Sequence, residues 1–386
     1  MTPFPKPVIV SSLLLAFVHL VGCGGGSSAA PVVPPGVQFL PPLVSGGHVL
    51  PRAISSDGGT VVGQATDADG LWRAFRWSAA TGTLPLGSLP GTSHETTAVS
   101  VSGDGSIVVG TSSDGQVTTS WSWTRDGGMR EIAMPEAAGW SDVSQVTENG
   151  AWAVGRYLAA ETGLLRVYVW SPSGGARTAL ELGADPDEVD RFYPAGITSD
   201  GFSVFLTSVA KVPGNGDGSW VFRYGLPYGQ GIVTSHFMQP TMCLDCRLYL
   251  APGAISRDGT AAAGSLTHVT DFTSPGVWFT GNELLQIAPP NWLDGMCISP
   301  GGTLVGGGAP NNGQAFLWSR TLGFLNLMTF LQEYDTVRGT HLADAFSGDV
   351  SRPASVVGIA ASDTRITGLV RSSDGLQLRA YVIDVP

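Results

Sequence analysis

The sequence predicts an all-β chain that folds as a single β-propeller, with seven four-stranded blades and an N-terminal strand that closes the last blade. Three observations lead to this fold class. A unit of short strands and tight turns recurs seven times along the chain. Glycine accounts for 53 of the 386 residues, about twice its usual share. The first apolar strand of the repeat region has the character of the one strand that the last unit lacks.

The clearest copy of the unit is residues 98–124, AVSVSGDGSIVVGTSSDGQVTTSWSWT. An apolar run leads into a Gly-Asp-Gly turn and a second apolar strand, and an Asp-Gly turn then leads into a strand that ends in tryptophan. Asp-Gly and Asn-Gly are typical of hairpin turns because both residues adopt positive φ cheaply. One more apolar strand follows, here MREIAM (129–134). A four-stranded meander repeated at this length is typical of propellers.

Two series of anchor residues set the number of units at seven. The first-turn positions are Asp57, Asp104, Asn149, Asp200, Asp258, Pro300 and Asp363. The aromatic positions near the end of the third strand are Trp77, Trp123, Trp170, Phe222, Trp278, Trp318 and Tyr381. The spacings within the two series rise and fall together, so the length differences fall between units. Since the aromatic positions recur with the repeat, we assign them to the core.

The two ends of the repeat region predict how the last unit is completed. The segment VQFLPPL (37–43) has the pattern of a closing strand, and the aromatic strand before Pro386 is followed by none. Pairing the two would protect sheet edges. A β-solenoid, a pair of smaller propellers and an array of β-sandwiches are the alternatives. Solenoid coils are shorter, at about 20–30 residues, and no Pro/Gly/Ser linker interrupts 37–386, which favours one domain.

Residues 1–22 have the character of a targeting segment. Lys6 precedes an apolar run that ends in Leu20-Val21-Gly22-Cys23, and this tetrapeptide resembles a bacterial lipobox. The resemblance implies a lipoprotein signal peptide, cleavage before Cys23 and acylation of that cysteine. The alternative is an ordinary signal peptide with an incidental cysteine. Residues 23–36 would then be the lipidated cysteine and a Gly/Ser/Pro tether. Because Gly24 is not aspartate, we expect an outer-membrane location, on its periplasmic or cell-surface face.

Charge excludes some partners. The chain carries 20 basic and 31 acidic residues, a net charge of −11. Nucleic-acid binding depends on a basic surface, so no nucleic-acid partner is expected. An acidic surface is also not attracted to anionic lipid, so membrane association would come from the lipid anchor alone.

Three short segments stand out in the units: AFRW (74–77), AFLW (315–318) and LGSLPG (86–91). Through these segments the units resemble HAF repeats, which are found in bacterial extracellular proteins. The first histidine of the motif is absent, and Arg73 and Gln314 stand in its place in the two best copies. The resemblance covers nearly all of 37–386. It implies export and a propeller-like fold, and it implies no settled activity.

Cysteines and acidic turns give few signs of chemistry. In an exported protein, Cys243 and Cys246 are most simply a local disulfide, with a redox pair as the alternative. Cys297 lies in an apolar pattern and is expected to be a small buried thiol. No nucleophile-elbow or phosphate-loop motif occurs, and no cofactor or metal is predicted. Calcium is the alternative for the oxygen-rich segments TDADG (66–70) and GNGDG (214–218).

The connections between units are where function is expected, because length variation concentrates there and long loops on a rigid scaffold often bind ligands. The three longest are 182–196, 232–253 and 328–354, and the first part of 328–354 could form a short helix. The candidate binding rim comprises Trp140, Asp142, Glu188, Arg191, Tyr193, Trp292, Asp294 and His341. The alternative is that these residues only form a solvated acidic surface.

Three functions fit this organisation. The leading hypothesis is a non-enzymatic surface lipoprotein that binds a protein or a glycan through the connections between units. The second is a polysaccharide hydrolase or lyase, which would need catalytic side chains to converge. Its candidates are Asp142, Glu188, Arg191, Asp294 and His341. The third is an assembly component of the envelope.

Overall fold

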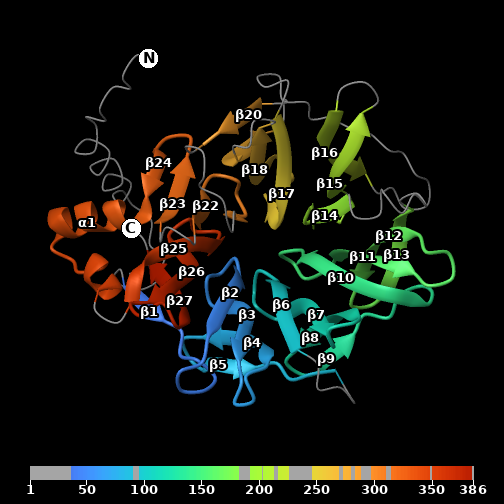
Figure 1. Cartoon of the computed structure of the whole chain (residues 1–386), viewed down its shortest axis with the longest axis horizontal. Coiled ribbons are helices and arrows are strands. Elements are labelled where there is room, and N and C mark those ends of the chain that lie inside the picture. The colour runs from blue at the N-terminus through green and yellow to red at the C-terminus, as the bar shows by residue number, and fades with distance from the viewer. Residues whose placement is uncertain are drawn as a thin grey trace, which may run out of the picture. The chain divides into compact units, whose positions relative to one another are not determined.

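The computed structural model describes residues 36–384 except for 90–94, 182–191, 202, 213–215, 226–245, 269–272, 280–282, 288–296, 310–313 and 348–349. The leader, Cys23 and the tether up to residue 35 lie outside the described residues. The described residues are predominantly β-strand, which confirms the all-β prediction (Figure 1). None of the helices in this part of the chain is both long enough and apolar enough to cross a membrane.

Four units form four-stranded antiparallel sheets, as the repeat predicts. The first contains β2 (Val49–Ile54), β3 (Val61–Thr66), β4 (Trp72–Ser78) and β5 (Gly82–Pro85). The second contains β6 (Glu95–Val101), β7 (Ile107–Ser113), β8 (Thr118–Thr124) and β9 (Gly128–Glu131). The third contains β10 (Ala138–Val146), β11 (Ala153–Ala159), β12 (Leu165–Ser171) and β13 (Gly175–Glu181). The fifth contains β17 (Cys246–Ile255), β18 (Ala261–His268), β19 (Thr273–Phe279) and β20 (Glu283–Gln286).

The other units depart from this pattern. The fourth has three strands among the described residues, β14 (Phe192–Ile197), β15 (Ser203–Val212) and β16 (Gly216–Gly225). The sixth contributes β21 (Cys297–Ile298), β22 (Val305–Ala309), β23 (Gln314–Ser319) and β24 (Gly323–Asn326). The seventh contributes β25 (Val350–Ile359), β26 (Arg365–Ser372), β27 (Leu378–Asp384) and β1 (Val37–Phe39). The last two units share one eight-stranded sheet.

A close backbone approach joins the sixth and seventh units. Gly308 of β22 pairs with Ser355 of β25. A Cβ atom on Gly308 would lie 2.1 Å from the carbonyl oxygen of Ala354, so only glycine permits this pairing. The sequence predicts two separate sheets here, and the structure instead bridges them.

The first and last strands of the repeat region pair as the sequence predicts. β1 runs antiparallel to β27, with Val37 opposite Ile383 and Phe39 opposite Tyr381. The contact continues beyond β1, where the Leu40 N–H donates to the Ala380 carbonyl at 3.0 Å. Strands from the two ends of the repeat region therefore complete the seventh unit.

In several units the first strand carries a β-bulge next to a glycine of the second strand. Register shifts occur between Pro51 and Ala53 and at the equivalent positions of other units, such as between Ala98 and Ser100. A Cβ on Gly63 would lie 2.0 Å from the Leu50 carbonyl oxygen, and one on Gly110 2.1 Å from that of Thr97. Gly155 and Gly368 make the same close approach. Bulge and glycine therefore form one device that recurs with the unit.

The register of the second and third strands corrects two of the seven aromatic anchors. Trp77 pairs with Val61, and the same position is filled by Trp123, Trp170, Trp278 and Trp318. In the fourth and seventh units Tyr224 and Ile383 occupy it. Phe222 and Tyr381 lie two residues earlier, opposite Leu206 and Gly368. The sequence pattern missed this shift because a residue two places along a strand points to the same face.

The seven first strands meet in cyclic order. Each of β2, β6, β10, β14, β17, β21 and β25 contacts the next, and β25 contacts β2. Hydrogen bonds link their turns in the same order. These bonds run from Asp57 N to Gly103 O, Gly103 N to Glu148 O, Asn149 Nδ2 to Ser199 O, Ser199 N to Arg257 O, Arg257 N to Pro300 O, Thr303 Oγ1 to Asp363 Oδ2 and Ala361 N to Ser56 O. We call this set the turn ring.

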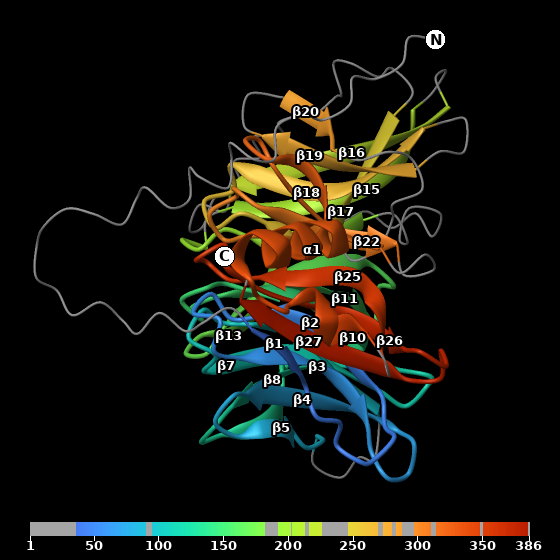
Figure 2. The ribbon, with the colours of Figure 1, turned by 90° about the vertical axis from the view of Figure 1, so that its left-hand side faces the viewer.

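A helical insertion replaces much of the long connection expected at 328–354. Helix α1 (Leu327–Arg338) and the short 3₁₀ helix η3 (Ala343–Phe346) lie between β24 and β25, and Figure 2 shows α1 beside β25. Asn326 caps α1 by accepting from the Thr329 N–H. Phe346 packs edge-on against Tyr381 at 5.3 Å between ring centroids. The insertion therefore belongs to the core of the last two units.

Candidate functional site

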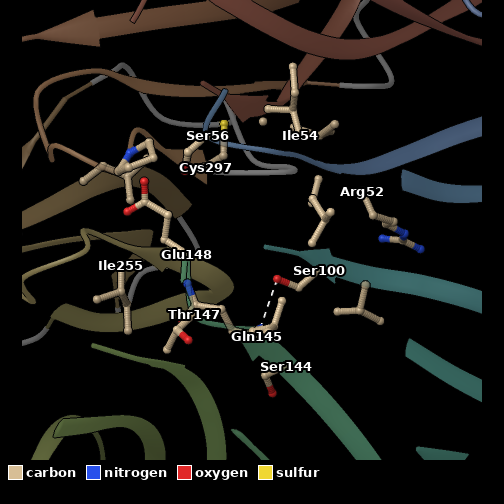
Figure 3. Close-up of a pocket in the computed structure, with 18 of the residues that line it drawn as sticks. Arg52, Ile54, Ser56, Ser100, Ser144, Gln145, Thr147, Glu148, Ile255 and Cys297 are labelled. Atoms are coloured by element: carbon tan, nitrogen blue, oxygen red, sulfur yellow. Dashed lines mark hydrogen bonds between the residues drawn. The ribbon is translucent and has the colours of Figure 1, made fainter. Parts of the chain in front are cut away.

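A cavity of about 690 Å³ lies between the first strands of the seven units (Figure 3). Residues from β2, β6, β10, β14, β17, β21 and β25 all contribute to its wall. Its volume lies within the range of small-ligand pockets, about 300–1,000 Å³. We call it the central cavity.

Small polar side chains fasten neighbouring units to one another along this wall. The Ser100 hydroxyl accepts from the Val146 N–H at 3.2 Å, the contact drawn as a dashed line in Figure 3. Gln145 Oε1 accepts from the Ile197 N–H at 2.8 Å. Each bond joins one first strand to the next. The wall is therefore held in place by the side chains that line it.

Three charged side chains belong to the described lining: Arg52, Glu148 and Arg257. Glu148 and Arg257 form an ion pair in which both guanidinium Nε and Nη2 reach the carboxylate. Glu148 belongs to the turn ring in the third unit and Arg257 in the fifth, so their contact passes across Ser199 of the fourth. The two charges cancel, so this ion pair adds no net charge to the lining of the central cavity.

Arg52 is the remaining charge. It occupies the bulge of β2, and its side chain is exposed while its strand neighbours Pro51 and Ile54 are buried. It has no hydrogen bond or ion pair with any other described residue. Arg52 lies two residues before the last residue of its strand. The equivalent residue is uncharged in every other unit, where it is Val99, Ser144, Ala195, Gly253, Met296 and Val357.

Two of the predicted rim residues lie together on β10, outside the lining of the central cavity. Asp142 forms an ion pair with Arg156 at 2.8 Å, and the Arg156 guanidinium lies 5.1 Å from the Trp140 ring centroid. Burial raises the pKa of Asp142, while the Arg156 charge opposes this shift. Trp140 is half-buried and packs against a buried cluster formed by residues of the third and fourth units. These two residues help to hold the third unit together.

The other predicted rim residues are not brought together among the described residues. His341 lies on the helical insertion, where its Nδ1 is 2.9 Å from Asp344 Oδ2 and both side chains are largely exposed. Tyr193 is in β14, and its side chain is not described. Glu188, Arg191, Trp292 and Asp294 lie outside the described residues.

Of the cysteine predictions, the structure tests the one for Cys297. Cys297 is a free, buried thiol, as predicted, and burial raises its pKa to about 12. Such a thiol is unreactive at neutral pH because the thiolate is scarcely populated. Cys243 and the Cys246 side chain lie outside the described residues, so their disulfide stays a prediction.

In TDADG (66–70), the alternative calcium site, the carboxylate of Asp67 already has protein partners. Asp67 Oδ1 accepts from the N–H groups of Asp69 and Leu71, and Oδ2 is 2.6 Å from Arg73 Nε. The hydrogen bond from Arg73 lowers the pKa of Asp67. Among the described residues, no three His, Cys, Asp or Glu side chains are grouped to hold a metal ion.

Solved structures similar to this one share its architecture. An oligogalacturonate lyase in complex with manganese is 11% identical, with a TM-score of 0.56 over 91% of this chain and 97% of the lyase. The β-propeller domain of the Trilobed protease from Pyrococcus furiosus is 9% identical, with a TM-score of 0.54 over 87% of this chain and 95% of that domain.

The fold is a β-propeller. At these identities the likeness establishes the fold of the propeller and no activity. TolB from Acinetobacter baumannii also matches, at 13% identity and a TM-score of 0.45, and this chain covers 85% of its own length and 64% of TolB. No protein-family model and no curated protein matches the sequence.

Sequence reasoning missed the three charges of the central cavity. The signal for Arg52 was present, since aligning the units on Ile54, Val101 and Val146 places one arginine in a column of uncharged residues. Glu148 and Arg257 are the two charged residues in the repeat column Ser56, Gly103, Glu148, Ser199, Arg257, Pro300 and Ala361. Their pairing across an intervening unit had no signature in the sequence.

Proposed function

We propose that this propeller is the non-enzymatic binding module of an exported lipoprotein and holds a protein or glycan through the connections between its units. The composition of the central cavity carries the proposal. Glu148 is the one carboxylate in the described lining, and Arg257 occupies it. Glycoside hydrolases work with two carboxyl groups. Hydroxyl and amide groups with one unpaired guanidinium are better suited to holding a ligand than to acid–base catalysis.

We further propose that the propeller has seven blades, the last of which β1 completes as the outer strand. The cyclic contacts of the seven first strands support this count. The turn ring supports it too, because its hydrogen bonds return from Ala361 to Ser56 after seven turns. Under this proposal the single pairing of Gly308 with Ser355 is a local bridge between the sixth and seventh blades.

The proposed address is the outer membrane, with Cys23 acylated and residues 24–36 as the tether. Changing Cys23→Ser should move the protein from the membrane fraction to the soluble periplasmic or extracellular fraction, because stable anchoring needs the acyl chains. Fractionation followed by immunoblotting measures this, and mass spectrometry of the wild-type N-terminus should find the lipid. Ser27→Ala, four residues into the tether, is the control. Persistent membrane association of Cys23→Ser would contradict the anchor.

Binding is tested with the full-length protein in detergent against arrayed glycans and separated envelope proteins. We expect saturable binding to one of them, weakened at least tenfold by Trp292→Ala, since a truncated aromatic anchor typically costs about 2 kcal/mol or more. Trp140→Ala is unsuitable because that ring packs within the third unit. Val337→Ala, an exposed side chain on α1, is the matched control. Binding that no change at the rim affects would defeat the proposal.

A propeller lyase or hydrolase is the second candidate, favoured by the shared fold with the oligogalacturonate lyase. It would require Asp142, Glu188, Arg191, Asp294 or His341 to act on a polysaccharide. Incubating the protein with oligogalacturonate, with and without manganese, separates the two candidates. Unsaturated uronate products absorb in the ultraviolet, and their appearance would replace the binding proposal with this one.

A further inference from the structure

We propose that the central cavity binds one small oxyanion, a carboxylate or a sulfate, on the guanidinium of Arg52. This inference rests on the proposed function, because it names the ligand chemistry of the propeller as a binding module. Arginine presents parallel N–H donors that match the oxygens of carboxylates and sulfates. The central cavity would supply the enclosure, and Arg52 the charge.

The charge balance of the described lining favours an anion. Glu148 and Arg257 neutralise each other, which leaves the lining with a net charge of +1 from Arg52. The chain as a whole carries −11. A single cation in a concave site attracts anions more strongly than the same group on an open surface, because low-dielectric walls focus its electric field. The cavity is therefore positive in an otherwise acidic protein.

The repeat shows that Arg52 is not needed by the scaffold. The equivalent bulge positions carry valine, serine, alanine, glycine and methionine in the other units, and those units form the same bulge or hairpin. Arg52 also lacks a hydrogen-bonding or ionic partner among the described residues. An exposed arginine without a partner in the described part of the chain adds no contact to the scaffold, so a bound ligand would account for its presence.

Polar side chains that share the cavity wall with Arg52 can complete such a site. Ser144 lines the cavity in the equivalent position of the third unit, and Thr97 lies on β6, beside β2. Figure 3 places Arg52 and Glu148 on opposite sides of the drawn cavity. The carboxylate of Glu148 is occupied by Arg257, so it leaves Arg52 available for the ligand. We expect the ligand to enter at the end opposite the turn ring.

The direct test uses calorimetry on the full-length protein in detergent, with d-glucuronate and inorganic sulfate as probes. Glucose is the matched neutral probe, since it replaces the carboxylate by a hydroxymethyl group. We expect each anion to bind with one site per chain, and glucose not to bind. Arg52→Gln should weaken glucuronate binding by ten- to a hundredfold, about 1.4 kcal/mol per factor of ten. Arg52→Lys, which keeps the charge and loses the fork, should fall between.

Matched variants separate charge from folding. Arg130→Gln, an exposed arginine on β9 outside the cavity lining, should leave anion binding unchanged. Ser144→Asp should weaken it while leaving Arg52 in place, because a new carboxylate in the lining would cancel its net charge of +1. Thermal unfolding of each variant checks that the fold is kept. Anion binding by Arg52→Gln equal to wild type, or no binding of either anion by wild type, overturns the inference.

The source of the oxyanion is distinguished with a second pair of probes. A glucuronate-containing polysaccharide and neutral dextran are compared with free glucuronate by competition. If the natural ligand is a polymer, the polysaccharide should bind more tightly than free glucuronate. If it is a free small anion, the polysaccharide should bind no more tightly than free glucuronate. Wild-type protein that captures the partner of the rim test but binds neither anion would leave the binding module standing and overturn the anion site alone.

Discussion

Replacing Gly63 with alanine should lower the free energy of unfolding by more than about 3 kcal/mol, a loss of the size that accompanies severe overpacking in a core. The added Cβ would lie 2.0 Å from the Leu50 carbonyl oxygen and 2.9 Å from the Pro51 Cα. Both are backbone atoms, which a side-chain rotation cannot move away. The bulge of β2 would have to flatten. Urea unfolding followed by circular dichroism measures the loss.

Gly139→Ala is the matched control, since Gly139 also lies in a strand and its nearest new contact would be at 3.7 Å from a leucine methyl. We expect a change within about 0.5 kcal/mol there. Gly110→Ala should behave as Gly63→Ala does, because its Cβ would meet the Thr97 carbonyl at 2.1 Å. Equal stability of the Gly63 and Gly139 variants would mean that the bulges are not fixed by these glycines.

Leu40→Ala should cost about 2–4 kcal/mol, the usual range for truncating a buried leucine. Leu40 is 2% exposed, directly after β1, and packs in one cluster with Val49, Trp77 and Val382. That cluster spans the first unit and β27, so the cavity left by the truncation would lie where the ends of the repeat region meet. The midpoint of thermal unfolding and the urea midpoint should both fall.

Leu84→Ala provides the comparison, because Leu84 is 47% exposed on β5. A change within about 0.5 kcal/mol is expected for it. Should Leu40→Ala prove as mild as Leu84→Ala, the junction of β1 with β27 would contribute little to the stability of the propeller.

The strands and turns of this fold were predictable because each unit repeats the same local signals. Asp104 shows why: its carboxylate accepts from Ser102 Oγ and from the Ser106 N–H, closing the turn with short-range bonds. Such bonds depend on residues two apart, which a sequence displays directly. The bridge at Gly308 and Ser355 was not predictable, because it joins strands from different units and leaves no periodic trace.

The candidate site was harder to predict than the fold, for a physical reason. Acidic and aromatic residues between units suggested a rim, yet Asp142 turns to Arg156 of its own sheet and Trp140 lies under the same guanidinium. Local ion pairs of this kind satisfy a charge without any ligand. Arg52 was overlooked because a strand pattern assigns side chains to alternate faces, and a bulge changes that assignment at one residue.

The pairing of β1 with β27 has a consequence for how the chain acquires its structure. The partners Val37 and Ile383 are separated by almost the whole repeat region, so the seam cannot form until the last strand has been synthesised. Contacts so distant in sequence slow folding, because a very long loop must be closed before they add any stability. Until β1 pairs with it, β27 offers an unpaired edge, to which another chain could add a strand. Docking of β1 is thus also the step that covers this edge of β27.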